Sequence, residues 1–240
     1  MKNNWFKKSI KKIKTDDFIS RLRSSVIGEG MLHEGNIYLM DYAIKNIPYN
    51  GIVFEIGSYA GLSTNLLLHL LEKHNQIHKL YSCDAWIYEG YHDCNENIKT
   101  YIDGREDIDR VNYMNYIKNA FINASQLLHP KRLPYTCHLY SDNLFKKWNL
   151  NENLTDVFGR QFTIQENIAF AYIDGDHSYK QTKSDFENVD SKLLVNGFVL
   201  IDDSGIEMPF GSAKFAKEVR KYKNYKLIAT NPNHLFQKIR

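Results

Sequence analysis

Three aspartates come directly after apolar runs of the sequence, where their carboxylates are placed for acid–base or metal chemistry. Asp174 follows the run IAFAYI, and Asp202 and Asp203 follow the run FVLI. Carboxylates that share one site repel each other, and burying them is costly unless they share protons or bind a cation. Oxygen ligands suit Mg²⁺, Mn²⁺ or Ca²⁺ better than zinc. We therefore expect a divalent cation at Asp174, Asp202 and Asp203, with Asp176 as an alternative to Asp174 from spacing alone.

His177 comes three residues after Asp174, where a loop is expected to enter a helix. Imidazole titrates near neutral pH, so His177 could act as a general base beside that cation. In a plainer interpretation, Asp176 or Ser178 caps the helix, the two later aspartates form a turn, and His177 lies on the surface. The occurrence of acidic residues at the ends of two strands favours the cation site over this plainer interpretation.

A βαβ unit is predicted to position these groups. Two buried strands, 168–173 and 198–201, flank an amphipathic helix whose apolar residues recur every three or four positions from Tyr179 to Leu193, and Gly197 is expected to mark its end. Parallel strands bring their carboxyl ends to one edge of the sheet. Open α/β sheets bind their ligands at that edge.

A second strand–turn–helix unit reads GIVFEIGSYAGLSTNLLLHL, with a strand at 52–56 and an apolar helix at 62–71. Gly57 and Gly61 bound a tight turn, where backbone N–H groups at a helix start can hold a ligand. The spacing is not the dinucleotide pattern GxGxxG. Glu55 would repel a diphosphate and suits a cationic amino acid moiety.

Two more predicted strands end in polar residues. Strand 79–83 ends at Asp84, whose carboxylate can accept both hydroxyls of a ribose. Strand 135–140 is followed by Ser141 and Asp142, which could cap the next helix or contact a purine ring.

These motifs carry a resemblance to a known family. The segments EIGSYAGLST at 55–64 and IDGDHSY at 173–179, with Asp84 and Ser141-Asp142, resemble the class I S-adenosylmethionine-dependent methyltransferases over roughly residues 30–240. Within that class, the acidic strand ends resemble the Mg²⁺-dependent O-methyltransferases, which include catechol-type, macrolide-sugar and aminocoumarin-sugar enzymes. The resemblance implies an α/β, Rossmann-like fold: a seven-stranded, mostly parallel sheet with helices on both faces and a C-terminal antiparallel hairpin at 225–239.

The resemblance also implies a role for each matched residue. The cofactor-binding set would be Glu55, Gly57, Ser58, Tyr59, Gly61, Ser63, Asp84, Ser141, Asp142 and Asp174. Asp174, Asp202 and Asp203 would hold Mg²⁺ or another divalent cation, and His177 would be the catalytic base, with Asp174 beside it. The acceptor implied is a small molecule, such as a sugar or nucleotide-linked sugar. The alternatives are a metal-independent methyltransferase, a non-catalytic relative and, disfavoured by the absent GxGxxG, a nicotinamide oxidoreductase.

Length and composition set the remaining expectations. A chain of 240 residues suits one α/β domain, here 1–240, with an N-terminal helical segment at 1–35 and a helical lid insertion at 85–134. The N-terminal segment is basic and amphipathic; we favour packing against the domain or a second subunit, compatible with a homodimer, over a membrane surface. The polar stretch 149–166 is expected to be exposed.

Charge and cysteine usage exclude several classes of protein. A net charge of +3 is too small to indicate a nucleic-acid partner, and no apolar run reaches the length of a membrane span. The three cysteines show neither a disulfide framework nor a zinc pattern, so a cytoplasmic location is expected. The insertion is rich in aromatic residues that could stack on an acceptor or pack between helices: Trp86, Tyr88, Tyr91, His92, Tyr113 and Tyr116.

Overall fold

The computed structural model describes residues 32–88 and 109–240. Most of the N-terminal segment at 1–35 and the part of the insertion at 89–108, with Tyr91 and His92, lie outside the described residues. The described helices and strands follow in this order: α2 (Glu34–Asn46), β1 (Ile52–Ile56), α3 (Leu62–Lys73), β2 (Leu80–Asp84), α4 (Arg110–Leu128), β3 (Tyr135–His138), α5 (Ser141–Asn149), β4 (Leu154–Thr155), β5 (Gln161–Phe162), β6 (Ile168–Ile173), α6 (Tyr179–Asp190), β7 (Leu193–Ile201), α7 (Gly211–Val219), β8 (Tyr225–Thr230) and β9 (His234–Lys238).

The main sheet has seven strands in the order β3-β2-β1-β6-β7-β9-β8. The first five of these are parallel, while β9 runs antiparallel to both β7 and β8. The predicted Rossmann-like sheet with a C-terminal antiparallel hairpin is confirmed. Because β1 leads to β2 on one side and β6 leads to β7 on the other, the order reverses between β1 and β6, where sheets of this kind bind ligands.

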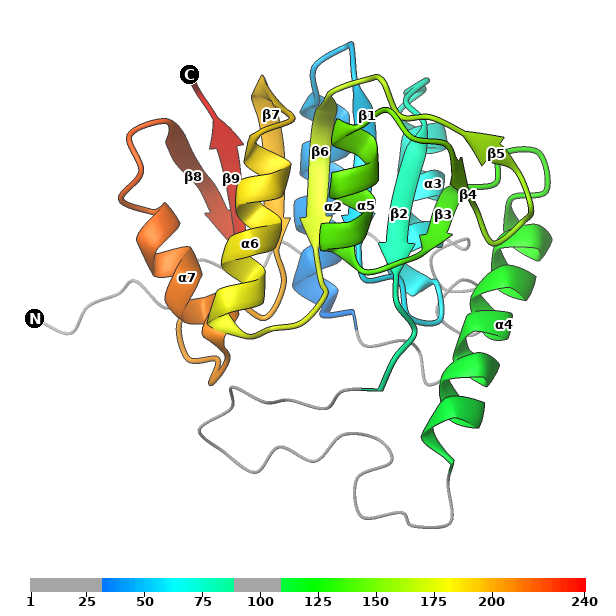
Figure 1. Ribbon diagram of the computed structural model, residues 1–240. Coiled ribbons are helices and arrows are strands. Elements are labelled where there is room, and N and C mark those ends of the chain that lie inside the picture. Colours follow the sequence, from blue (N-terminus) through cyan, green and yellow to red (C-terminus); the bar gives the residue numbers. More distant parts are fainter. Residues whose placement is uncertain (1–31, 89–108) are drawn as a thin grey trace, which may run out of the picture.

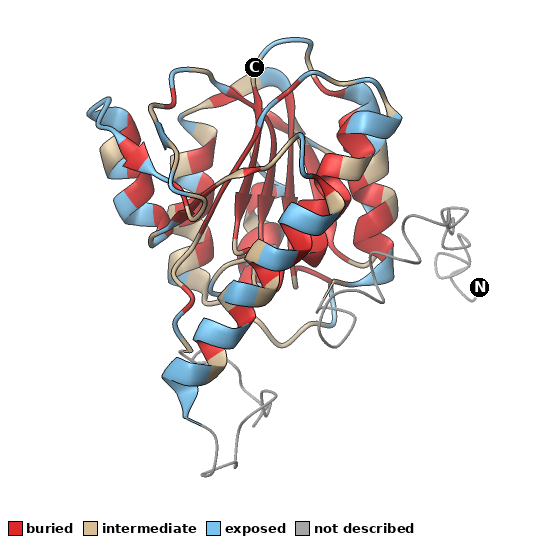
Figure 2. Cartoon of the chain, turned by 90° about the vertical axis from the view of Figure 1, so that its right-hand side faces the viewer, coloured by how far each residue is buried: buried red, intermediate tan, exposed pale blue. Residues whose placement is uncertain are grey.

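Helices cover both faces of the sheet. Figure 1 shows α5, α6 and α7 in front of the strands and α2 and α3 behind them. Two hydrophobic clusters follow from this layering: one packs residues of α2, α3 and α4 against one face, and the other packs residues of α5, α6 and α7 against the opposite face. Strands β1 and β6 are buried along their whole length, although β1 includes Glu55. Figure 2 shows the strands buried between helices with exposed outer surfaces.

The end of α6 differs from the prediction. The helix stops at Asp190, and Leu193 already belongs to β7, where it pairs with Ile168. Leu193 falls on the helical spacing of apolar residues only by coincidence. It is apolar because it is buried as a residue of β7. Gly197 therefore lies inside a strand and does not end the helix; a Cβ there would be 2.8 Å from the carbonyl oxygen of Leu194 and 3.0 Å from that of Ala169.

The stretch 149–166 was expected to be exposed and is only partly so. It forms a small two-stranded antiparallel sheet, β4–β5, in which Leu154 and Ile164 are buried. Asp156 is also buried and accepts the backbone N–H groups of Phe158 and Arg160 in the turn between the strands. No helix in the described part of the chain has the length and apolar character needed to cross a membrane.

Candidate active site

The glycine turn and the acidic loop meet where the strand order reverses. The backbone N–H of Asp174, at the end of β6, donates to the carbonyl of Ile56, at the end of β1 (2.8 Å). Gly57 has φ +83°, and a Cβ on it would be 1.9 Å from the carbonyl oxygen of Asp174. Gly61 has φ +93° and is the N-cap of α3. Gly57 is therefore required by the neighbouring backbone of Asp174.

Asp84 fixes the shape of the glycine turn. Its Oδ2 accepts the backbone N–H groups of Ser58 and Tyr59, both at 2.8 Å, and its Oδ1 accepts the N–H of Trp86 at 2.6 Å. Burial raises the pKa of Asp84, and these backbone donors oppose the rise. The side chain predicted to hold a ribose therefore also orders the loop that would carry the cofactor.

Glu55 lies beneath the same turn and is fully buried. It accepts hydrogen bonds from the hydroxyls of Ser58 (3.0 Å) and Thr64, and Ser63 also supports it. Burial raises the pKa of Glu55 to about 7, against the lowering effect of these hydroxyls. Its Oε1 has no hydrogen-bond partner in the described structure. An orphaned buried carboxylate oxygen under a loop of backbone donors fits a cofactor that has both an amino group and a carboxylate.

Ser141 and Asp142 begin α5, but the N-cap is Tyr140 and no side chain caps the helix there. The capping alternative for this pair is therefore wrong. Ser141 donates instead to Asp185 of α6 (2.5 Å), and Asp142 accepts from Ser184 (3.0 Å) and from a neighbouring asparagine of α6. Both residues fasten α5 to α6 just after β3, whose last residue, His138, pairs with Asp84 at the end of β2.

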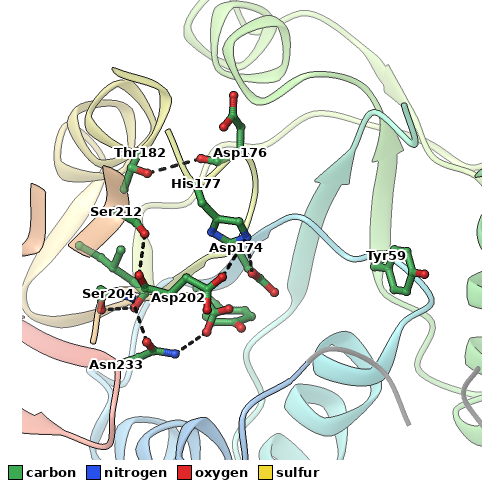
Figure 3. Close-up of polar contacts among 12 residues, drawn as sticks. Tyr59, Asp174, Asp176, His177, Thr182, Asp202, Ser204, Ser212 and Asn233 are labelled. Carbon is green, nitrogen blue, oxygen red and sulfur yellow. Dashed lines mark hydrogen bonds and ion pairs between the residues drawn. The ribbon is translucent and has the colours of Figure 1, made fainter. Parts of the chain in front are cut away.

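His177 lies between two of the predicted carboxylates. Its Nε2 is 3.8 Å from Oδ1 of Asp174 and 3.6 Å from Oδ2 of Asp203, and Figure 3 shows the ring directed at Asp174. The His177 side chain is 15% exposed and each of the two aspartates is 24% exposed, so the group is reachable from solvent. Burial lowers the pKa of His177, although Asp202 and Asp176 oppose this. A neutral imidazole is the form that can accept a proton.

Asp176, the alternative to Asp174, points away from this group in Figure 3 and is exposed. Its Oδ1 accepts the N–H of Ser178 (2.8 Å), and Ser178 is the N-cap of α6, accepting from the N–H of Gln181. The capping part of the plainer interpretation is therefore correct for Ser178. His177, however, faces the acidic side chains and does not lie on an ordinary surface.

Asp202 is held by two asparagines that no local sequence pattern singles out. Its Oδ1 accepts from the side-chain amides of Asn36 and Asn233, the latter at 2.6 Å, and all three side chains are almost completely buried. Burial raises the pKa of Asp174 well above its ordinary value, and the charge of Asp202, a hydrogen bond to it and the charge of Asp203 add to this rise. Asp174, Asp202 and Asp203 therefore influence one another electrostatically.

The donor chemistry at this position fits a hard divalent cation. Burial raises the pKa of Asp203 to about 6 and also raises that of Asp202, and within residues 32–88 and 109–240 no lysine or arginine forms an ion pair with the three aspartates. Across the same residues, however, no three or more His, Cys, Asp or Glu side chains are arranged as a metal centre. The structure thus supplies carboxylate oxygens that no lysine or arginine neutralises in the described chain, but it does not arrange them as a complete set of metal ligands.

Aromatic side chains lie on the side of the glycine turn away from His177. Tyr59 is on that side in Figure 3, and its hydroxyl contacts the hydroxyl of Tyr113 on α4. The indole N–H of Trp86 donates to the carbonyl of Tyr59 (2.9 Å), and Trp86 is buried against Phe121. Trp86 is therefore a packing residue, while Tyr116 is exposed.

Solved methyltransferase structures share this fold. The O-methyltransferase NovP is 16% identical, with a TM-score of 0.56 over 88% of this chain and 82% of that chain. CalS11, a calicheamicin methyltransferase, is 16% identical, with a TM-score of 0.55 and 94% of each chain covered. TomG from Streptomyces achromogenes, an O-methyltransferase involved in tomaymycin synthesis and solved with S-adenosylmethionine, is 8% identical, with a TM-score of 0.56 over 95% of this chain and 92% of that chain.

The sequence itself identifies the family. No curated protein matches the chain. The model of a methyltransferase domain family matches residues 54–204, which include the glycine turn, Asp84, the DGDH loop and the acidic pair after β7. This chain belongs to that methyltransferase domain family and is an S-adenosylmethionine-dependent methyltransferase.

Proposed function

We propose that this enzyme is an O-methyltransferase that methylates a hydroxyl group of a small molecule, with a sugar or nucleotide-linked sugar as the acceptor class. The observation that carries the proposal is the position of His177, whose Nε2 lies 3.8 Å from Asp174 and 3.6 Å from Asp203 at the carboxyl edge of the sheet. A partly exposed imidazole with a lowered pKa is suited to take a proton from a hydroxyl.

The chain's own residues account for the transfer in one step. His177 accepts the hydroxyl proton at Nε2, while an oxygen lone pair of the acceptor forms the new bond to the methyl carbon. Bound S-adenosylmethionine would supply that methyl carbon, and the electron pair of its carbon–sulfur bond would stay on sulfur, which would leave S-adenosylhomocysteine. Asp174 and Asp203 stabilise the imidazolium that forms, because both carboxylates face the ring.

We further propose that Asp174, Asp202 and Asp203 hold Mg²⁺ or another divalent cation. A cation bound there lowers the pKa of a coordinated hydroxyl. The support is the donor set: oxygen ligands from three aspartates whose pKa values are raised, with no lysine or arginine paired to them in the described chain. A metal-independent transfer by His177 is the second candidate, favoured because the imidazole already pairs with two of these carboxylates.

One experiment separates these possibilities. Methyl transfer from S-adenosylmethionine is measured on a panel of free sugars, nucleotide-linked sugars and catechols, with Mg²⁺ and with excess EDTA. Transfer to a sugar hydroxyl that stops in EDTA and returns with Mg²⁺ supports the complete proposal. Unchanged transfer in EDTA rejects the cation and leaves the His177 mechanism. Transfer to catechols alone rejects the acceptor class, and no transfer to any hydroxyl, while S-adenosylhomocysteine binds, rejects O-methylation.

A further inference from the structure

Two buried asparagines converge on a single oxygen of Asp202. Asn36 comes from the first turn of α2, and Asn233 comes from the turn between β8 and β9; both are 0% exposed. The side-chain Nδ2 atoms of both asparagines donate to Oδ1 of Asp202, at 2.6 Å for Asn233. Asp202 itself is only 4% exposed, so these amides replace the water that would otherwise solvate this oxygen.

The surrounding hydrogen bonds fix which way each amide faces. The backbone N–H of Ser204 donates to Oδ1 of Asn233 (2.9 Å), so the NH₂ group of Asn233 must face Asp202. That NH₂ also donates to Oδ1 of Asn36 (3.0 Å), which turns the NH₂ group of Asn36 toward Asp202 and the hydroxyl of Tyr172 (3.3 Å). Reversing either amide would place two donors or two acceptors face to face in a buried site.

Tight packing between α2 and the β8–β9 turn fixes the positions of the two asparagines relative to each other. A Cβ on Gly35 would be 1.6 Å from the carbonyl oxygen of Asn231, so the start of α2 lies directly against the turn that carries Asn233. The side chain of His33 caps α2 by accepting the N–H of Gly35 (3.0 Å). Neither donor can move without displacing a helix end or a strand turn.

We propose that Asn36 and Asn233 are positioning residues that hold Oδ1 of Asp202, so that Asp202 offers a divalent cation only its Oδ2. This inference rests on the proposed cation role of the three aspartates. A carboxylate fixed in this way binds in one-oxygen geometry and loses little rotational freedom when the cation arrives. Residues that orient metal ligands in other proteins change metal affinity about 10–100-fold when they are removed.

Cation binding can be measured without turnover. Mn²⁺ is titrated into the wild-type enzyme and the Asn36→Leu and Asn233→Leu variants in the presence of S-adenosylhomocysteine, and free Mn²⁺ is followed by electron paramagnetic resonance. We expect each variant to bind Mn²⁺ about 10–100-fold more weakly. S-adenosylhomocysteine affinity, measured calorimetrically, should change less than about twofold, because neither asparagine contacts the glycine turn.

Ser204→Ala is the matched control. Ser204 is equally buried, and its hydroxyl joins β7 to the same hairpin through Ile201 and His234, but it makes no hydrogen bond to the Asp202 carboxylate. This variant should lose stability without losing Mn²⁺ affinity. Should a leucine variant not fold, the Asn→Ser variants at the same positions carry the same test, since they shorten the side chain without adding bulk.

The outcomes separate this inference from the function on which it rests. Wild-type Mn²⁺ binding that both asparagine variants retain overturns the positioning role and leaves the cation site standing. An equal loss of affinity in Ser204→Ala also overturns it, because the effect would then reflect loosened packing. A wild-type enzyme that binds no Mn²⁺ overturns the cation role itself, and this inference with it.

Discussion

The backbone of Gly57 lies against the backbone carbonyl of Asp174: a Cβ on Gly57 would be 1.9 Å from that oxygen. The two residues directly follow the neighbouring strands β1 and β6, which lead into the glycine turn and the acidic loop. One close contact thus sets the distance between the part of the site expected to hold the cofactor and the part expected to hold the acceptor.

Gly57→Ala should cost more stability than its backbone conformation alone explains. Gly159 is a matched control, because it has a similar φ of +81° but a Cβ added to it would have no neighbour within 4 Å, whereas Gly57 has φ +83° and the contact with Asp174. We expect Gly57→Ala to cost about 1–3 kcal/mol more than Gly159→Ala in urea unfolding, from overpacking. Equal costs would show that the Asp174 contact relaxes without penalty.

His177→Ala should lower kcat about 10²–10⁴-fold, the usual contribution of a general base. S-adenosylhomocysteine affinity should stay within about twofold, since the ring of His177 faces Asp174 and Asp203 in the acidic loop. His177→Gln, which keeps a polar side chain but cannot take the proton, should be similarly slow. A glutamine variant with wild-type kcat would assign His177 a packing role.

The pH dependence of turnover follows from the same residue. A protonated imidazole cannot accept the hydroxyl proton, so activity should fall as the pH is lowered. Burial lowers the pKa of His177 from its ordinary 6.5, so the acidic inflection in kcat should lie below that value. An inflection above 6.5 would mean that the neighbouring carboxylates, and not burial, control the imidazole.

Asp84→Asn should weaken cofactor binding. Asp84 accepts three backbone N–H groups, from Ser58, Tyr59 and Trp86, and an amide NH₂ would face donors at one of these positions. Hydrogen bonds to a charged group contribute about 1.5–3 kcal/mol, so we expect a roughly 10–100-fold loss of S-adenosylhomocysteine affinity by calorimetry. Asp156→Asn is the control, because Asp156 likewise accepts two backbone N–H groups, but in the β4–β5 turn. A similar loss in that variant would point to general destabilisation.

Two buried acids should make folding stability fall as the pH rises. Burial raises the pKa of Glu55 from 4.5 to about 7 and that of Asp185 from 3.8 to about 7, so the folded state holds these protons more tightly than the unfolded state. Their neutral forms favour the folded state at low pH, and that advantage is lost as the pH rises toward 7.

Glu55→Gln and Asp185→Asn should each flatten this dependence. Urea unfolding at pH 5 and pH 8 should show the difference in unfolding free energy shrinking by on the order of 2 kcal/mol for each variant. Glu152→Gln, an exposed change, should leave the difference intact. A wild-type enzyme more stable at pH 8 than at pH 5 would contradict the assignment.

Local sequence pattern was enough for the sheet and for the placement of Asp174 and Asp202 at its edge. Strand β6 is a continuous apolar run, as is the last part of β7, and parallel pairing then brings Asp174 and Asp202 to one edge. The pattern failed where one residue satisfied two periodicities: Leu193 extends the helical spacing of α6 but is buried in β7. It also failed at Ser141, a good helix-capping residue that bonds to Asp185 of another helix instead.

The partners of Asp202 lay beyond local pattern altogether. Asn36 is an isolated polar residue near the start of a helix, and Asn233 looks like an ordinary turn residue between two strands. Their role arises because the sheet inserts β9 next to β7, which brings the hairpin turn to the end of the strand that carries Asp202. Only the three-dimensional pairing of distant segments creates the site.

Asn36 and Asn233 are 197 positions apart, and this separation has a consequence for synthesis of the enzyme. A nascent chain that has emerged from the ribosome as far as residue 204 contains every motif matched by the family model, yet Asp202 still lacks the second of its amide donors. A fragment limited to residues 54–204 would lack both. The acidic site is therefore completed only after the β8–β9 turn has been translated.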